Sequence, residues 1–209
     1  MKGHQVADMK PMDIEKKSME IIERELTAPL SEETKPIVMR VIHATADFSF
    51  SENIRTTPGA VGLMREMLKS GATVMTDTNM ALSGINRAAA KKLGLTLLCL
   101  MADEDVAAEA KARGITRAAV SMERGLTIPG RKIFVCGNAP TFLFPLMKAA
   151  PQSGVAAIGV PVGFVNVVEA KEMLWESGIP SIVAMGRRGG SNVAAAIVNA
   201  LMYGIEGVR

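Results

Sequence analysis

The first third of the chain has apolar residues at the three- and four-residue spacing of amphipathic helices. The first predicted helix begins near Pro11, ends near Thr27 and is amphipathic, with apolar residues at Ile14, Ile21, Ile22 and Leu26. A second, capped around residues 31–34, runs to about residue 44, and a third spans residues 58–69. The chain therefore opens with helices before any strand pattern appears.

From residue 73 onward, short and continuously apolar runs alternate with helical stretches. Continuous apolar runs are typical of strands covered on both faces, and five repeats of strand, loop and helix favour a parallel sheet. We therefore predict an α/β fold: a three-layer, doubly wound, mostly parallel five-stranded sheet with N-terminal helices, in a single domain over residues 1–209. The five strands are expected at Thr73–Thr76, Thr96–Met101, Lys132–Cys136, Ala156–Val160 and Ser181–Met185.

Composition narrows the function classes. The net charge is only +3 and aromatic residues make up 4% of the chain, which argues against a nucleic-acid-binding protein. Residues 1–8 lack the apolar segment of a signal peptide, and the uncharged stretch 149–168 is broken by proline and glycine, so we expect no membrane span. Cys99 and Cys136 lie in apolar runs typical of buried thiols, which indicates a cytoplasmic protein without a zinc cluster.

A doubly wound sheet binds its ligands beyond the carboxyl ends of its strands. The loop 186–191, with two arginines and three glycines before a helix, suits an anion there, although a tight turn with solvated arginines explains it equally well. Residues 137–141 resemble a structural helix cap. The glycine spacing of a dinucleotide site and a Walker loop are both missing from the sequence.

Two helical positions are candidates for chemistry. On a helical wheel, Arg40 and His43 share a face opposite the apolar stripe, and histidine transfers protons near neutral pH, although a plain surface histidine has the same pattern. Ser18 interrupts the apolar face of the first helix next to Lys17. Its hydroxyl either bonds back to its own helix or faces a ligand.

Several segments together resemble the precorrin-8X methylmutase family of cobalamin biosynthesis, and the likeness extends over about residues 14–201. Their order and spacing make the resemblance specific, although each segment is short. The segments are Ile14–Ser18, Arg40–Ala44, Asp77–Met80 with Gly84, Gly137–Thr141, Pro161–Val165 with Glu169 and Lys171, and Gly186–Ser191.

The resemblance implies an isomerase that moves a methyl group from C11 to C12 of precorrin-8X or cobalt-precorrin-8, giving hydrogenobyrinate or cobyrinate. It implies His43 as the catalytic acid/base, a corrinoid substrate, a homodimer, and no cofactor or protein-bound metal, any cobalt belonging to the substrate. The implied substrate-binding residues are Lys17, Ser18, Arg40, Asn86, Arg87 and Arg117. The family has arginine where this chain has Lys17, and lysine lacks the planar fork for a bidentate carboxylate contact.

Two other functions are compatible with parts of this pattern. A non-catalytic tetrapyrrole carrier would need the same cationic surface but would not turn over a substrate. A Rossmann-type dehydrogenase would bind a nicotinamide cofactor, which the missing glycine spacing argues against.

Overall fold

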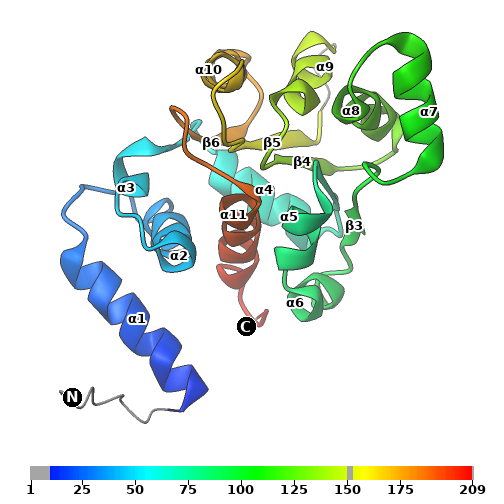
Figure 1. Cartoon of the computed structure of the whole chain (residues 1–209). Coiled ribbons are helices and arrows are strands. Elements are labelled where there is room, and N and C mark those ends of the chain that lie inside the picture. Colours follow the sequence, from blue (N-terminus) through cyan, green and yellow to red (C-terminus); the bar gives the residue numbers. More distant parts are fainter. Residues whose placement is uncertain (1–9, 150–152, 209) are drawn as a thin grey trace, which may run out of the picture.

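A computed structural model of the chain describes residues 10–149 and 153–208. These residues build one six-stranded sheet in the order β1-β6-β5-β4-β2-β3, in which only β1 runs antiparallel to its neighbour (Figure 1). The strands are β1 Ile54–Thr56, β2 Thr73–Thr76, β3 Thr96–Leu98, β4 Lys132–Cys136, β5 Val155–Gly159 and β6 Ser181–Ala184. The predicted α/β class and parallel core of the sheet are confirmed.

The predicted count of five strands is wrong, because β1 was not foreseen. It is three residues long, pairs with β6 at the edge of the sheet and buries only Ile54 fully. A strand that short carries no periodic pattern, and a one-turn helix precedes it directly. The strand expected at 96–101 ends three residues early, so Cys99 follows it and is half-buried, whereas Cys136 is buried as predicted.

Helices surround the sheet, and the N-terminal ones begin and end close to their predicted limits. They are α1 Pro11–Glu25, α2 Lys35–Thr45, α3 Phe50–Asn53, α4 Ala60–Lys69, α5 Asn79–Gly84, α6 Arg87–Lys92, α7 Glu104–Arg113, α8 Arg117–Thr127, α9 Leu143–Lys148 (after a 3-10 turn, η1 Pro140–Phe142), α10 Val167–Glu176 and α11 Ser191–Tyr203. Among the described residues, no helix has the length and apolarity needed to cross a membrane. The N-terminal segment 1–8 lies outside the described residues.

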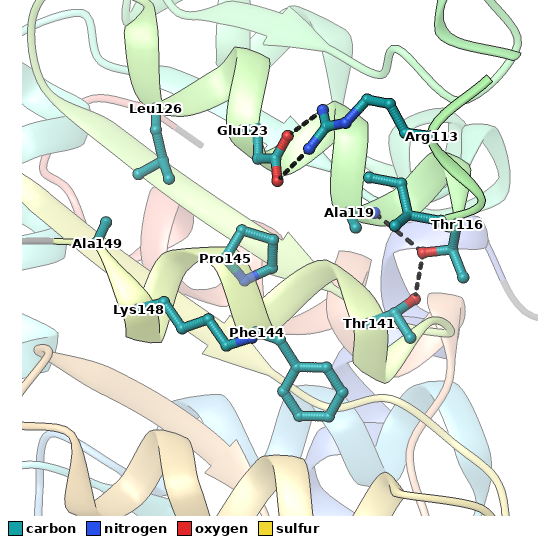
Figure 2. A pocket seen from close by; sticks show the side chains of 11 residues that line it. Arg113, Thr116, Ala119, Glu123, Leu126, Thr141, Phe144, Pro145, Lys148 and Ala149 are labelled. Atoms are coloured by element: carbon teal, nitrogen blue, oxygen red, sulfur yellow. Dashed lines mark hydrogen bonds and ion pairs between the residues drawn. The ribbon is translucent and has the colours of Figure 1, made fainter. Parts of the chain in front are cut away.

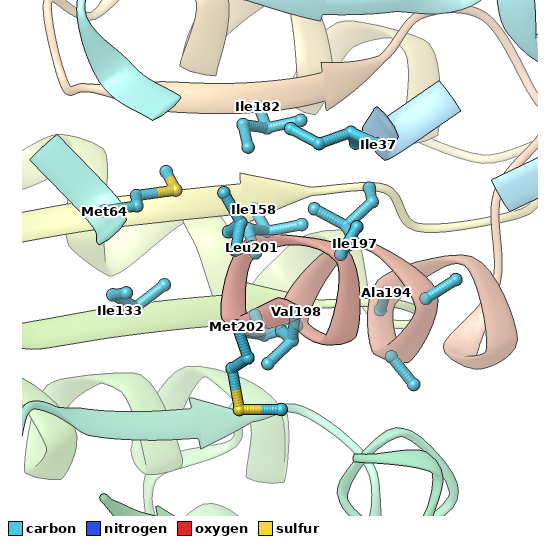
Figure 3. Packing of buried hydrophobic residues seen from close by; sticks show 14 of the residues in the cluster. Ile37, Met64, Ile133, Ile158, Ile182, Ala194, Ile197, Val198, Leu201 and Met202 are labelled. Carbon is cyan, nitrogen blue, oxygen red and sulfur yellow. The ribbon is translucent and has the colours of Figure 1, made fainter. Parts of the chain in front are cut away.

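Two apolar cores lie on opposite faces of the sheet, so the fold has the three predicted layers. Alternate strand residues face each way: Ile133 and Ile158 join the core under α2, α4 and α11, whereas Phe134 and Ala157 join the core under α8, α9 and α10. In Figure 3, α11 lies against the strands, and its Leu201 lies next to Ile158 of β5 in the shared core. The α11 helix is therefore the central element of its layer, with α2 on one side and α5 on the other (Figure 1).

Candidate active site at the carboxyl edge of the sheet

His43 lies in the last turn of α2 and is exposed, as the helical wheel predicts. Ile37, Val38, Val41 and Ile42 bury the opposite side of the same helix. Ala46, in a left-handed conformation, ends α2, and Asp47 follows it. An ion pair between Asp47 and Arg188 then connects this end of α2 to the loop after β6. The fold thus brings His43 to the carboxyl edge of the sheet, where ligands of this fold class bind.

The loop after β6 presents two arginines with different partners. Arg188 donates to both carboxylate oxygens of Asp47, at 2.9 and 2.7 Å, and also contacts the Ser49 hydroxyl. The Ser49 side chain, together with Arg188, lowers the pKa of Asp47. Arg187 instead lies over the ring of Phe164, 5.5 Å from its centroid. Arg188 is therefore engaged within the protein, whereas Arg187 has no ion-pair partner among the described residues.

Lys171 of α10 lies beneath this loop and is fully buried. Its ammonium donates hydrogen bonds to the carbonyls of Gly186 and Arg188, at 2.8 and 2.7 Å. Burial lowers the pKa of this lysine to about 8, since the charged form loses its hydration.

This shifted pKa predicts a pH-dependent stability. Between a folded pKa of about 8 and the ordinary 10.5, the unfolded chain binds one more proton at Lys171 than the folded chain, so the free energy of unfolding rises with pH. Relative to Lys171→Met, wild type should gain up to about 3 kcal/mol across this window. Urea unfolding of both proteins from about pH 7 to 10.5 measures the difference. Parallel pH profiles for the two proteins would contradict it.

Asp77 organises the neighbouring loop after β4. It is buried at the end of β2, and its carboxylate accepts the backbone N–H groups of Gly137, Asn138 and Ala139 at 2.8, 2.7 and 2.6 Å. Burial raises the pKa of Asp77, and these three hydrogen bonds oppose the rise. The loop 137–141 is thus held by a side chain from another strand.

A second polar cluster lies around Arg40, one helical turn before His43. Arg40 pairs with Glu15 of α1 at 2.7 Å and lies over the ring of Tyr203, 5.2 Å from its centroid. Asn86 caps α6 through Ala89 and donates to the Tyr203 hydroxyl at 2.8 Å. Two of the six expected substrate-binding residues, Arg40 and Asn86, therefore meet at Tyr203, near the C-terminal end of α11.

Three other expected substrate-binding residues, Lys17, Ser18 and Arg87, make fewer contacts with other elements. Ser18 donates to the carbonyl of Ile14 at 2.8 Å, which is the back-bonded alternative, and Lys17 beside it is exposed. Arg87 is exposed at the start of α6. Ser18 follows Glu15 by three residues and so lies beside it on α1, whereas Lys17 follows it by two and lies on a different face of the helix.

Arg117 does not join this group within one chain. It begins α8, in the layer on the opposite face of the sheet from α2, and donates to the carbonyl of Met101 at 3.2 Å. Next to Arg117, a pocket of about 550 Å³ lies between α8 and α9 (Figure 2). The Thr116 hydroxyl donates a hydrogen bond to the Thr141 hydroxyl at its edge, and Phe144 and Pro145 form part of its wall. Its lining contains none of the expected site residues.

Exposed apolar side chains accompany the polar groups at the carboxyl edge. Phe164 and Val165 in the loop after β5 are 82% and 76% exposed, and Met80 at the start of α5 is 74% exposed. Large apolar surfaces left in water are typical of binding sites. This edge therefore combines exposed apolar side chains with two exposed basic side chains, those of His43 and Arg187. Among the described residues, no cluster of histidine, cysteine or acidic side chains could hold a metal ion.

Four residues of this region had no predicted role from the sequence: Lys171, Asp77, Asp47 and Tyr203. A signal existed for Lys171, because it follows Val167 by four residues and precedes Leu174 by three, on the buried face of its helix. Asp77 directly follows an apolar strand, at the edge where ligands bind. The Asp47–Arg188 and Arg40–Tyr203 contacts join residues far apart in the sequence, so no local pattern indicates them.

Comparison with known proteins identifies the family. The family model described as "Precorrin-8X methylmutase" matches residues 13–204. The cobalt-precorrin-8 methylmutase of Salmonella typhimurium is 44% identical over 169 residues, covering 80% of each chain. The precorrin-8X methylmutase of Pseudomonas aeruginosa is 37% identical over 180 residues, covering 83% of this chain and 86% of that protein.

A solved structure agrees with the sequence relatives. The precorrin-8X methylmutase of Thermus thermophilus superimposes with a TM-score of 0.84 at 38% identity, covering 92% of this chain and 95% of that one. Sequence and fold thus match the same proteins along most of their lengths, and the resemblance noted in the sequence is confirmed. The chain belongs to the precorrin-8X methylmutase family, and it is therefore a methylmutase, an isomerase of cobalamin biosynthesis.

Proposed function

We propose that this enzyme moves the methyl group on C11 of a corrin precursor to C12, with His43 as the acid/base. The observation that carries the proposal is an exposed histidine at the ligand-binding edge of a methylmutase fold. Its imidazolium would donate a proton on the C11 side of the macrocycle, which favours migration of the methyl group to C12. The imidazole would then take a proton back, so that the net reaction is an isomerisation. Since the shift is an intramolecular isomerisation, it needs no electron or group donor, and we propose that no cofactor takes part.

The rest of the site would bind and shape the macrocycle. The exposed apolar side chains at residues 80, 164 and 165 suit the face of a corrin ring, and the cations suit its carboxylates. Holding a flexible ring in one reactive shape and excluding water are the main contributions available to such an enzyme. The substrate-binding residues that we propose are Lys17, Ser18, Arg40, Asn86, Arg87 and Arg117.

Turnover distinguishes this enzyme from a non-catalytic carrier. Purified protein is mixed with precorrin-8X or, separately, with cobalt-precorrin-8, and visible absorption follows formation of hydrogenobyrinate or cobyrinate. We expect turnover of at least one of the two, which also shows whether the substrate carries cobalt. Tight binding of both without any spectral conversion would instead support a tetrapyrrole carrier.

Arg40 provides a prediction about binding. In the protein alone, Glu15 neutralises Arg40, so a substrate carboxylate would have to replace Glu15. Arg40→Leu should therefore raise the Kd for hydrogenobyrinate about tenfold or more, the loss expected for one charged hydrogen bond. Glu15→Gln, which keeps the arginine and removes its partner, should leave this Kd unchanged or lower it.

Absorption titrations at low and high salt measure both effects. The loss in Arg40→Leu should shrink as salt rises, because the interaction that it removes is ionic. If both variants weakened binding equally, the ion pair between α1 and α2 would be the important feature, and Arg40 would not bind the substrate.

We propose further that the enzyme works as a homodimer in the cytoplasm. The α1 helix packs on α2, while Ile14 and Ile21 remain 51% and 38% exposed on the same side as Ser18. A second copy covering this face would bury both isoleucines and bring Ser18 toward a shared site. Cys99 and Cys136, which form no disulfide, fit a cytoplasmic protein.

The dimer has its own test. Light scattering at micromolar concentration should give twice the chain mass of 22.2 kDa for wild type. Ile21→Glu places a charge on the exposed apolar face and should shift the mass toward the monomer. Lys16→Ala, an exposed position on the same helix, is the control and should remain dimeric. A monomeric wild type with full turnover would exclude the shared site.

A further inference from the structure

Lys171 is an unusual choice for the buried face of α10. A methionine would fill the same space without the cost of desolvating an ammonium group. The side chain instead directs its Nζ atom to two backbone carbonyls of the loop after β6, those of Gly186 and Arg188. The lysine is therefore better explained by what it holds than by packing.

Further backbone contacts hold the same loop between and after the two carbonyls that Lys171 binds. The carbonyl of Arg187, between the two that Lys171 binds, accepts the N–H of Gly163 at 3.2 Å. Gly190 donates its N–H to the carbonyl of Val160 at 2.9 Å. A Cβ at Gly189 would lie 2.1 Å from that same carbonyl oxygen, so the loop backbone sits directly on the end of β5.

The fixed backbone conformation of this loop determines the direction of the two arginine side chains. Three successive carbonyls, from residue 186 to residue 188, have donors within the protein, and both arginine side chains are exposed. Arg188 reaches Asp47 beyond the end of α2, and Arg187 lies over Phe164. Asp47 follows His43 by four residues, so the loop also contacts the segment that ends the histidine's helix.

We propose that Lys171 is a positioning residue for the methyl shift: its ammonium fixes the 186–188 backbone so that Arg187 faces the substrate and Arg188 holds the end of α2. This inference rests on the proposed function, because it assigns the loop to the substrate site. Lys171 itself is buried and does not touch the macrocycle.

Lys132 is a matched control within the same sheet. It is also buried, and its Nζ atom donates to two backbone carbonyls, those of Ile128 and Gly130, at 2.6 and 3.2 Å. It begins β4, so it lies at the opposite edge of the sheet from the proposed site. Replacing either lysine by methionine removes the same chemistry, but only one of the two lies beneath the arginine loop.

The test compares Lys171→Met, Lys132→Met, Arg187→Leu and the double variant Lys171→Met/Arg187→Leu. Lys171→Met should raise KM and the Kd for hydrogenobyrinate about tenfold, with a smaller change in kcat, since a binding contact is displaced. Lys132→Met should leave KM unchanged. In the double variant the two effects on Kd should add only in part, because Lys171 acts on binding partly through Arg187.

Wild-type KM in Lys171→Met, equal effects of the two lysine variants, or fully additive effects in the double variant would each overturn the proposal. If Lys171→Met does not fold, Lys171→Gln, which keeps an N–H donor, replaces it and should raise KM by a smaller factor. Full wild-type behaviour of Lys171→Gln, with its shorter reach, would also count against the proposal.

Amide hydrogen exchange separates this proposal from the proposed function. Without any substrate, Lys171→Met should speed exchange of the amides in residues 186–190, whereas Lys132→Met should not. If wild type turns over neither macrocycle but this exchange pattern appears, the proposed function fails while the loop-fixing role of Lys171 stands. Unchanged exchange in Lys171→Met shows that the lysine does not fix the loop.

Discussion

His43→Ala should lower turnover of the macrocycle about 10²–10⁴-fold, the range that general acid/base groups contribute. The chain should still fold, because His43 is exposed and lies outside the apolar stripe of α2, so its loss changes the free energy of unfolding by about 0.5 kcal/mol or less. Initial rates by visible absorption and urea unfolding measure the two quantities.

Two controls separate proton transfer from a steric role of His43. His43→Gln keeps a polar side chain that cannot exchange a proton near neutral pH, and it should be as inactive as His43→Ala. Added imidazole should restore part of the activity of His43→Ala but not that of a sample without enzyme. Wild-type turnover in a folded His43→Ala variant would falsify the assignment.

Asp77→Ala should lower the free energy of unfolding by about 3 kcal/mol, since it removes the acceptor of three backbone N–H groups, each costly to leave unpaired. The loop 137–141 would lose its fixed conformation, so activity should fall as well. Urea unfolding measures the stability, and the midpoint should move without a large change in slope.

Asp103 provides the comparison for this prediction. It too is an aspartate beyond the carboxyl end of a strand, but it is exposed and its side chain makes no capping bond to α7. Asp103→Ala should therefore cost less than about 1 kcal/mol. Equal losses in the two variants would mean that a general charge effect, and not the three hydrogen bonds, explains Asp77.

The order of elements could be read from the sequence because most of them are long or strongly apolar. The five parallel strands and the helices α1, α2 and α4 are single stretches whose periods differ clearly. β1 was missed because three residues with one buried side chain leave no period to detect, and its pairing with β6 depends on residues far along the chain. Local pattern thus predicts elements, whereas edge pairing depends on tertiary structure.

In the candidate site too, properties set by one helix could be predicted from the sequence, whereas contacts between distant segments could not. Exposure of His43 follows from the helical wheel, since one helix determines it. The pairing of Arg40 does not follow from the helical wheel, because its partners Glu15 and Tyr203 come from α1 and α11. Arg188 likewise appeared free for a ligand in the sequence, but Asp47 engages it. Charge alone could not show which cations the protein neutralises itself.

The pairing of β1 with β6 also determines when this protein can fold during synthesis. Ile54 of β1 meets Ala184 of β6, and α2 packs on α11, so α2 and β1 have these partners in residues 181–203, far along the sequence. Ile37 and Val38, which are fully buried in the finished fold, have to wait for those partners. Contacts of such long sequence separation slow folding and leave apolar surface open to aggregation. A nascent chain halted before residue 181 therefore lacks a place to bury α2, and the native structure forms only after residues 181–203 have emerged.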